Sequence, residues 1–183
     1  MKIQEEFSIK SEVFDWLEAI CFSIVAIILV FTLFFRSAQV EGSSMLPNYH
    51  EGDRLVLINT ALSKVETGDV VVITQPTAVG HPLIKRVIAT EGQTVDINYI
   101  TGEVKVDGVV LSEDYIMEPI NSVPYDPVDY PFTVGKGKIF VMGDNRNASS
   151  DSRNAGIGEI DTRYILGKAI FRILPFESFG SIV

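Results

Sequence analysis

The pattern of apolar and polar positions divides the 183-residue chain into two parts of different kinds. Residues 19–35 form a run of 17 residues without a charge, and Arg36 ends it. As a helix, this run would extend about 26 Å, at the short end of what crosses a bilayer core. Leu17 and Trp16 lengthen the run, and Trp16 stands where an interfacial aromatic side chain would lie. The pattern predicts a single transmembrane helix over residues 17–36, preceded by a short cytoplasmic tail of residues 1–16.

Two other interpretations of the apolar run are open. A cleaved signal peptide would have a basic segment before the run and a small-residue cleavage site after it. Here the preceding residues are mixed and mostly acidic: Glu5, Glu6, Glu12, Asp15 and Glu18. A buried core helix is less favoured, because the run is apolar on all faces. An uncleaved anchor is therefore the preferred interpretation, although the flanking Lys and Arg residues favour a cytoplasmic N-terminus only weakly.

Residues 37–183 have the pattern of an all-β domain, with short β-branched runs between turn signals. Asp107-Gly108 between two valine-bearing runs is typical of a tight hairpin. Four prolines over residues 119–131 predict a loop, and one helical turn is expected over 60–65. Strands are predicted at 54–58, 70–74, 83–89, 94–98, 104–106, 109–111, 138–142 and 165–174. The predicted fold class is mainly β: one N-terminal membrane helix followed by a small barrel-like β domain.

Composition excludes several classes of function. A net charge of −9 argues against binding to nucleic acid, which needs clustered Lys and Arg. Cys21 is the one cysteine, so no intramolecular disulfide can form. His50 and His81 are the two histidines, and with a lone cysteine they make a zinc site improbable. Both histidines are expected in surface loops, and no metal or cofactor is predicted.

A serine and a lysine are the candidate reactive groups. A serine hydroxyl is a poor nucleophile at neutral pH unless a base lies beside it. Lysine can serve as that base if burial lowers its pKa, because burial disfavours the ammonium form. Lys85 fits, since strand alternation puts it on one face with Leu83 and Val87. Ser44 alone could equally be a loop serine, and Lys85 alone a surface lysine.

A third polar segment follows a predicted buried strand. It reads Gly-Asp-Asn-Arg-Asn-Ala-Ser-Ser-Asp-Ser-Arg over residues 143–153. Charged partners and hydroxyls in this density suggest a hydrogen-bonded loop that supports a site, although such a segment alone could be a polar surface turn.

Together and in this order, the segments resemble type I signal peptidases (leader peptidases) of the bacterial Ser-Lys type, membrane-bound enzymes that remove signal peptides from exported preproteins. The resemblance covers nearly the whole chain. It comprises the anchor, Ser44-Met45-x-Pro47, Gly52-Asp53, Lys85-Arg86-Val87, Gly143-Asp144-Asn145-Arg146 and Ser149-x-Asp151-Ser152-Arg153. This chain departs from the family pattern at Asn147-Ala148, where an acid and an amide are common, and at Asn48-Tyr49, where a threonine is common.

The resemblance implies a role for each matching residue. Ser44 matches the nucleophile, Lys85 the general base, and Ser149 the serine that orients the base. The backbone N–H of Ser44 would be one oxyanion donor. Some members have a serine at the position of Gly42 that supplies a second donor, and glycine there resembles the variant common in Gram-positive members. The residues that match those holding the site together are Asp144, Arg146, Asp151 and Arg153, and the candidates for lining the substrate pocket are Val40, Met45 and Ile84.

The resemblance also implies a reaction and partners. The reaction is acyl transfer to Ser44 after Ala-x-Ala-like sites, without a cofactor. The expected partners are signal-peptide-bearing preproteins, the lipid bilayer and the secretion translocon, with residues 37–183 extracytoplasmic. Ser44 follows Phe35 by nine residues, which span at most about 32 Å, so the nucleophile would stay near the bilayer. The alternatives are a non-catalytic membrane-anchored assembly or chaperone module and a self-cleaving repressor-type protease, for which no DNA-binding pattern is visible.

Overall fold

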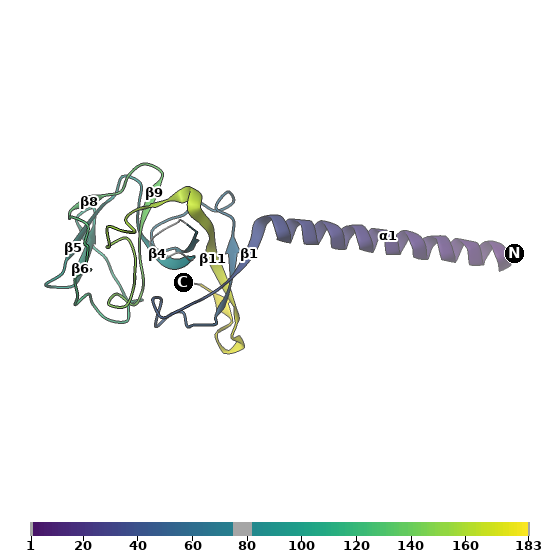
Figure 1. Ribbon diagram of the computed structural model, residues 1–183. Coiled ribbons are helices and arrows are strands. Elements are labelled where there is room, and N and C mark those ends of the chain that lie inside the picture. Colours follow the sequence, from purple (N-terminus) through teal and green to yellow (C-terminus); the bar gives the residue numbers. More distant parts are fainter. Residues whose placement is uncertain (1, 75–81, 183) are drawn as a thin grey trace. The chain divides into compact units, whose positions relative to one another are not determined.

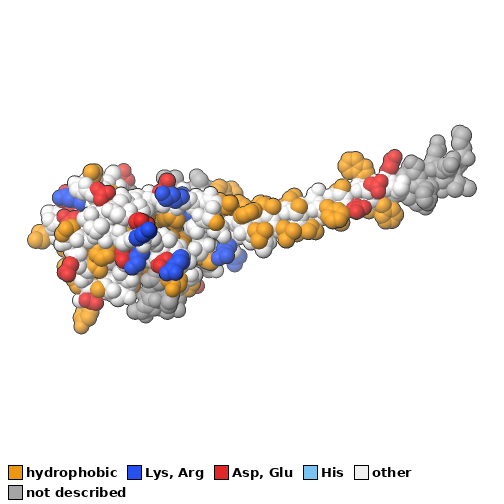
Figure 2. All heavy atoms as spheres, turned by 90° about the horizontal axis from the view of Figure 1, so that it is seen from above, with side chains coloured by type: hydrophobic (Ala, Val, Ile, Leu, Met, Phe, Trp, Pro, Cys, Tyr) orange, Lys and Arg blue, Asp and Glu red, His pale blue; other side chains and the backbone are white. Residues whose placement is uncertain are grey.

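The computed structural model describes residues 2–74 and 82–182, and its chain divides into two compact units, Met1–Phe35 and Arg36–Val183 (Figure 1). The first unit is one helix, α1 (Lys2–Phe34). Within it, Ser11–Phe34 has a mean hydropathy of 2.6 and is long and apolar enough to cross a membrane. Its apolar side chains are exposed, as Figure 2 shows along the helix. The helix ends at Phe34, two residues before the predicted end of the anchor, because Phe35 begins the first strand.

The second unit is mainly β, as predicted, and consists of a curled eight-stranded sheet and a smaller four-stranded sheet (Figure 1). The order of the larger sheet is β1-β2-β11-β3-β4-β9-β10, with β12 also paired to β11. The order of the smaller sheet is β7-β6-β5-β8. The strands are β1 (Phe35–Gln39), β2 (Arg54–Ile58), β3 (Val70–Ile73), β4 (Leu83–Thr90), β5 (Thr94–Asn98), β6 (Glu103–Val106), β7 (Val109–Val110), β8 (Phe132–Thr133), β9 (Lys138–Met142), β10 (Ile160–Asp161), β11 (Ile165–Leu174) and β12 (Gly180–Ser181).

All eight predicted strands are present, and the local signals explain their ends. Asp107 and Gly108 both have positive φ, 52° and 80°, as the tight hairpin between β6 and β7 requires. The proline-bearing segment 119–131 is irregular, as predicted. Residues 60–62 form a turn and residue 63 a bend, while 64–65 have no regular structure, so the expected helical turn over 60–65 is not present. Two short 3₁₀ turns, Thr162–Tyr164 and Phe176–Ser178, flank β11.

Three apolar clusters form the core of the second unit. One fills the space between the small sheet and β4 and β9, and includes Ile88, Val95 and Phe140. The second contains Leu83 and Val87, the two apolar neighbours predicted to share a face with Lys85. The third lies beside the segment after β1, and its members include Val40, Met45 and Leu57. The last two clusters hold the strand that carries Lys85 and the turn that carries Ser44.

Candidate active site

Ser44 lies in a turn between β1 and β2, in which Leu46 N–H donates to Ser43 O and Tyr49 N–H donates to Met45 O. Met45 holds this turn down, because its side chain is buried in the third apolar cluster. Gly42 precedes the turn with a φ of +77°, a conformation that glycine adopts without strain. The serine hydroxyl is thereby presented from a fixed turn.

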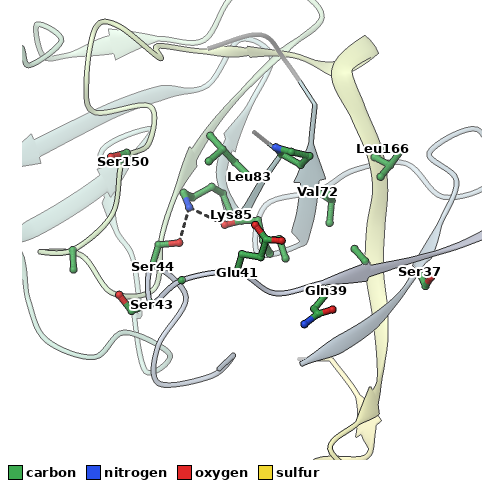
Figure 3. Close-up of a pocket in the computed structure, with 15 residues that line it drawn as sticks. Ser37, Gln39, Glu41, Ser43, Ser44, Val72, Leu83, Lys85, Ser150 and Leu166 are labelled. Atoms are coloured by element: carbon green, nitrogen blue, oxygen red, sulfur yellow. Dashed lines mark hydrogen bonds between the residues drawn. The ribbon is translucent and has the colours of Figure 1, made fainter. Parts of the chain in front are cut away.

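Lys85 lies on β4 and is 2% exposed, and its Nζ donates to the Ser44 hydroxyl at 2.7 Å (Figure 3). Nζ also donates to the backbone oxygen of Ile84 at 2.9 Å. Burial lowers the pKa of Lys85 from 10.5 to about 8, although the Asp151 and Asp144 carboxylates act in the opposite direction. The amine is therefore within reach of the serine proton, and a fraction of it is neutral near physiological pH.

The loop after β9 attaches the nucleophile turn to the sheet. Asn145 N–H donates to Ser44 O at 3.0 Å, and the Asn145 side-chain amide donates to Ser43 O at 3.2 Å. Gly143 sits where any side chain would collide with Ser149 and with the Ser44 carbonyl. This close approach of two backbones is the physical reason for glycine at position 143.

A buried ion pair joins β4 to the same loop. The Arg86 guanidinium donates two hydrogen bonds of 2.8 Å to the Asp144 carboxylate, and both side chains are at most 3% exposed. The Asn48 amide donates to the same carboxylate at 2.8 Å and to Tyr115 O at 2.6 Å. The Arg86 guanidinium carbon lies over the Tyr115 ring, 4.3 Å from the ring centroid. Three segments thus meet at one carboxylate.

Four residues at this site were not predicted as site residues: Arg86, Asn48, Asn145 and Tyr115. Arg86 follows Lys85 in the Lys85-Arg86-Val87 motif, so its position next to the candidate base was a usable signal. Asn48 was visible only as a departure from the family pattern, and the structure now accounts for it as a donor to Asp144. Tyr115 comes from a distant segment, and no local pattern indicated it.

A second buried pair stabilises the distal part of the loop. Arg153 donates to Asp151 at 2.8 and 2.9 Å and to the Arg146 backbone oxygen at 2.7 Å. Asp151 also accepts from Gly143 N–H at 3.0 Å. Although burial alone would raise it, these contacts hold the pKa of Asp151 below its usual value. Arg146 is buried as well, with its guanidinium 2.5 Å from the Glu113 carboxylate.

Ser149, predicted to orient the base, makes no hydrogen bond to Lys85 in this structure. Its hydroxyl is buried without a well-formed hydrogen bond to any described residue, but it lies close enough to the Asp151 carboxylate to help lower the pKa of that group. The orienting role therefore stays a prediction. The departure at Asn147 is compensated, because its amide group accepts from Asn121 N–H at 2.9 Å and donates to Pro119 O at 3.0 Å.

A cavity of about 450 Å³ opens beside the Ser44–Lys85 pair (Figure 3). Of the three candidates for the substrate pocket, Ile84 lines this cavity, but Val40 and Met45 are not among its lining residues. Both are 1% exposed because they point into the third apolar cluster, so the structure corrects this part of the pocket prediction. The apolar lining comes instead from Ala38, Val72, Pro82, Leu83, Ile84, Ala148 and Leu166.

His50 is the one histidine within the described residues. His50 is exposed in a turn away from this cavity, as expected, and His81 lies outside the described residues. Within residues 2–74 and 82–182, no three His, Cys, Asp or Glu side chains converge as metal ligands would.

Comparisons with known proteins find relatives that match most of the chain. Signal peptidase I of Bacillus licheniformis is 37% identical over 174 residues, which cover 92% of each chain. Signal peptidase I T of Bacillus subtilis (strain 168) is 37% identical over 89% of this chain and 86% of its own. A probable signal peptidase I-1 of Synechocystis is 37% identical over 86% of this chain and 82% of its own. The family described as signal peptidase, peptidase S26, matches residues 13–174, and the chain therefore belongs to this family.

Proposed function

We propose that Ser44 and Lys85 form the catalytic dyad of this signal peptidase and that it removes signal peptides from exported preproteins. The observation that carries the proposal is the 2.7 Å contact between Lys85 Nζ and Ser44 Oγ beside an open cavity. The family match supports the same conclusion, because it is a match to peptidases along 162 consecutive positions, residues 13–174. It gives no support to a non-catalytic module.

In this mechanism, neutral Lys85 accepts the hydroxyl proton of Ser44 while Oγ attacks the scissile carbonyl carbon. The resulting ammonium gives its proton to the leaving amine as the peptide bond breaks. Lys85, neutral again, then removes a proton from the water that attacks the acyl-enzyme ester, and Ser44 recovers its proton on release. The chemistry is complete with these two side chains and one water.

The oxyanion of each tetrahedral intermediate needs hydrogen-bond donors. The Ser44 backbone N–H is the first proposed donor. Gly42 lines the same cavity and has no side chain, so only its backbone N–H could contribute. Asn145, Asp144 and Arg86 act further away, because they fix the nucleophile turn against β4.

The size and lining of the cavity support substrates that have small residues before the scissile bond. Its apolar lining leaves room for short side chains, consistent with the Ala-x-Ala-like sites expected from the resemblance. We propose α1 as a single membrane anchor with the N-terminus cytoplasmic and Arg36–Val183 extracytoplasmic. The nine residues from Phe35 to Ser44 would keep the nucleophile within about 32 Å of the end of the anchor. The bilayer and the secretion translocon are the proposed neighbours.

Cleavage of a labelled preprotein by the detergent-solubilised full chain tests the dyad. We expect Ser44→Ala and Lys85→Ala each to lower the rate by more than about a thousandfold while the fold is retained. Ser112→Ala and Lys64→Ala are the matched controls, since both residues are exposed and neither lines the cavity, and they should cleave as the wild type does. Full activity of Lys85→Ala would reject the dyad, and an inactive wild type would favour the non-catalytic alternative.

A further inference from the structure

Glu41 is a charged residue at the cavity that the mechanism does not use. It lies three positions before Ser44, it is exposed, and it is among the residues that line the cavity. Figure 3 shows its carboxylate pointing among the lining side chains, between Lys85 and Gln39 in that view. Its carboxylate has no hydrogen bond or ion pair with any described residue, so none of the described residues neutralises its charge.

The carboxylate of Glu41 is one of few charged groups among the residues that line the cavity. Glu41 and Lys85 are the two charged residues in the described lining, and the rest of it is neutral. Lys85 must be neutral to act as the base, and its amine is turned toward Ser44 Oγ and Ile84 O. In the reactive state, Glu41 therefore supplies the one formal charge of the described lining, and that charge is negative.

The position of Glu41 limits which part of a substrate it can contact. Three residues of chain span at most about 10 Å, and an extended substrate advances about 3.3 Å per residue. The carboxylate is therefore within reach of side chains up to about three residues from the scissile bond. Small side chains are expected on both sides of x in an Ala-x-Ala site, which leaves the x position and the residues just after the cut free to carry charge.

We propose that Glu41 is a specificity-determining residue, whose carboxylate favours substrates with a Lys or Arg side chain within three residues of the scissile bond and disfavours acidic ones there. The inference rests on the proposed function, since it assigns a selectivity to the same cavity. An exposed ion pair of this kind is worth about 0.2–1 kcal/mol and is screened by salt. The selectivity should accordingly be modest and sensitive to ionic strength.

Peptides with an Ala-x-Ala-like site test this proposal. Lys, Gln or Glu is placed in turn at x and at the first, second and third positions after the cut, and kcat/KM is measured with the full chain in detergent at low salt. For at least one position, we expect the wild type to prefer Lys over Glu by about two- to tenfold. The preference should vanish in Glu41→Gln, reverse in Glu41→Lys, and shrink in 0.5 M salt, a concentration that shortens the screening length to about 4 Å.

Glu51→Gln is the matched control, because it removes the same charge from an exposed glutamate that lines a different cavity. It should keep the wild-type preference. If the Lys-to-Glu ratio at every position is unchanged by Glu41→Gln, or if Glu51→Gln changes it equally, the proposal is overturned while cleavage of the Gln peptides still supports the dyad. If the wild type cleaves none of the peptides, the proposed function fails and the selectivity fails with it.

Discussion

In the proposed mechanism Lys85 must be neutral to accept a proton, and the fold favours the neutral form by burying the amine. The side chain is 2% exposed on β4, between Leu83 and Val87 of the second apolar cluster. Burial lowers its pKa to about 8, so the folded state holds the amine at a cost to stability. Reactivity and instability at this residue have the same physical origin.

Lys85→Met should abolish cleavage and raise the stability of the fold. A pKa lowered from 10.5 to about 8 corresponds to roughly 3 kcal/mol, which is an upper figure for the gain because the hydrogen bonds of Nζ are lost. The unfolded chain binds more protons than the folded chain between about pH 8 and 10.5, so wild-type stability rises with pH there and the full cost is present below pH 8. Denaturant unfolding at pH 7 and pH 10 measures both effects. A variant less stable than the wild type at both pH values would contradict this account.

Gly143→Ala should disrupt the site without changing any polar group. An added Cβ would collide with Ser149 and with the Ser44 carbonyl, so the turn that carries Ser44 must move away from the loop after β9. We expect kcat/KM to fall at least about a hundredfold, since displacements of about 1 Å cost that much. Gly92→Ala is the control for inserting a methyl group, as nothing lies near its Cβ, although its positive φ should cost some stability. Unchanged catalysis in Gly143→Ala would show that the loop tolerates the shift.

At the scale of elements, the site is an assembly of β4, the turn after β1 and the loop after β9. Arg86 on β4 donates to Asp144 on the loop, and Asn145 on the loop donates to Ser44 on the turn. Neither contact is local in sequence, so each depends on the sheet order that brings β4 beside β9. The Arg86–Asp144 pair is expected to hold Ser44 and Lys85 in their relative positions.

Arg86→Met should destabilise the domain by about 3–5 kcal/mol, because it leaves the Asp144 carboxylate buried without its cation. Lys105→Met removes a cation from the half-exposed pair with Glu103 and should cost at most about 1 kcal/mol. Chemical denaturation at pH 7 compares the two variants. Equal losses would mean that the buried pair has no special structural role.

The difference between local signals and contacts that are distant in sequence explains how much of the structure the sequence could predict. Strands were predictable where β-branched runs ended at turn signals, as at 54–58 and 138–142. Four strands were missed. β8, β10 and β12 have two residues each, too few to show a period, and β1 has no β-branched residue in its sequence FRSAQ. Ser44 and Lys85 carried chemical signals of their own, whereas Tyr115 acts only through tertiary contacts. Val40 and Met45 were misplaced because their neighbourhood in sequence did not reveal which way each side chain points.

At the scale of the whole molecule, the chain joins an apolar helix to a domain that has its own core. The three apolar clusters consist of residues from Ala38 onward, so the second unit contains the packing that it needs to fold. The helix has the length and hydropathy to cross a membrane. We therefore expect anchoring and chemistry to be separable.

A chain of residues 36–183 should fold, remain in the supernatant when membranes are sedimented, and cleave a short peptide with a kcat within about tenfold of the full chain. Cleavage of membrane-inserted preproteins should fall much further, because the tether no longer concentrates the enzyme at the bilayer. Parallel assays on peptide and on preprotein in vesicles measure the two effects. Equal losses on both substrates would show that α1 contributes to the site itself.

The most direct measurement of the central claim is the pH dependence of kcat/KM for the full chain on a peptide without titratable side chains. We expect a rate that is low at pH 6, rises about tenfold per pH unit, and reaches half of its maximum near pH 8, where Lys85 loses its proton. A rate that is flat from pH 5 to 9 would contradict Lys85 as the base that activates Ser44.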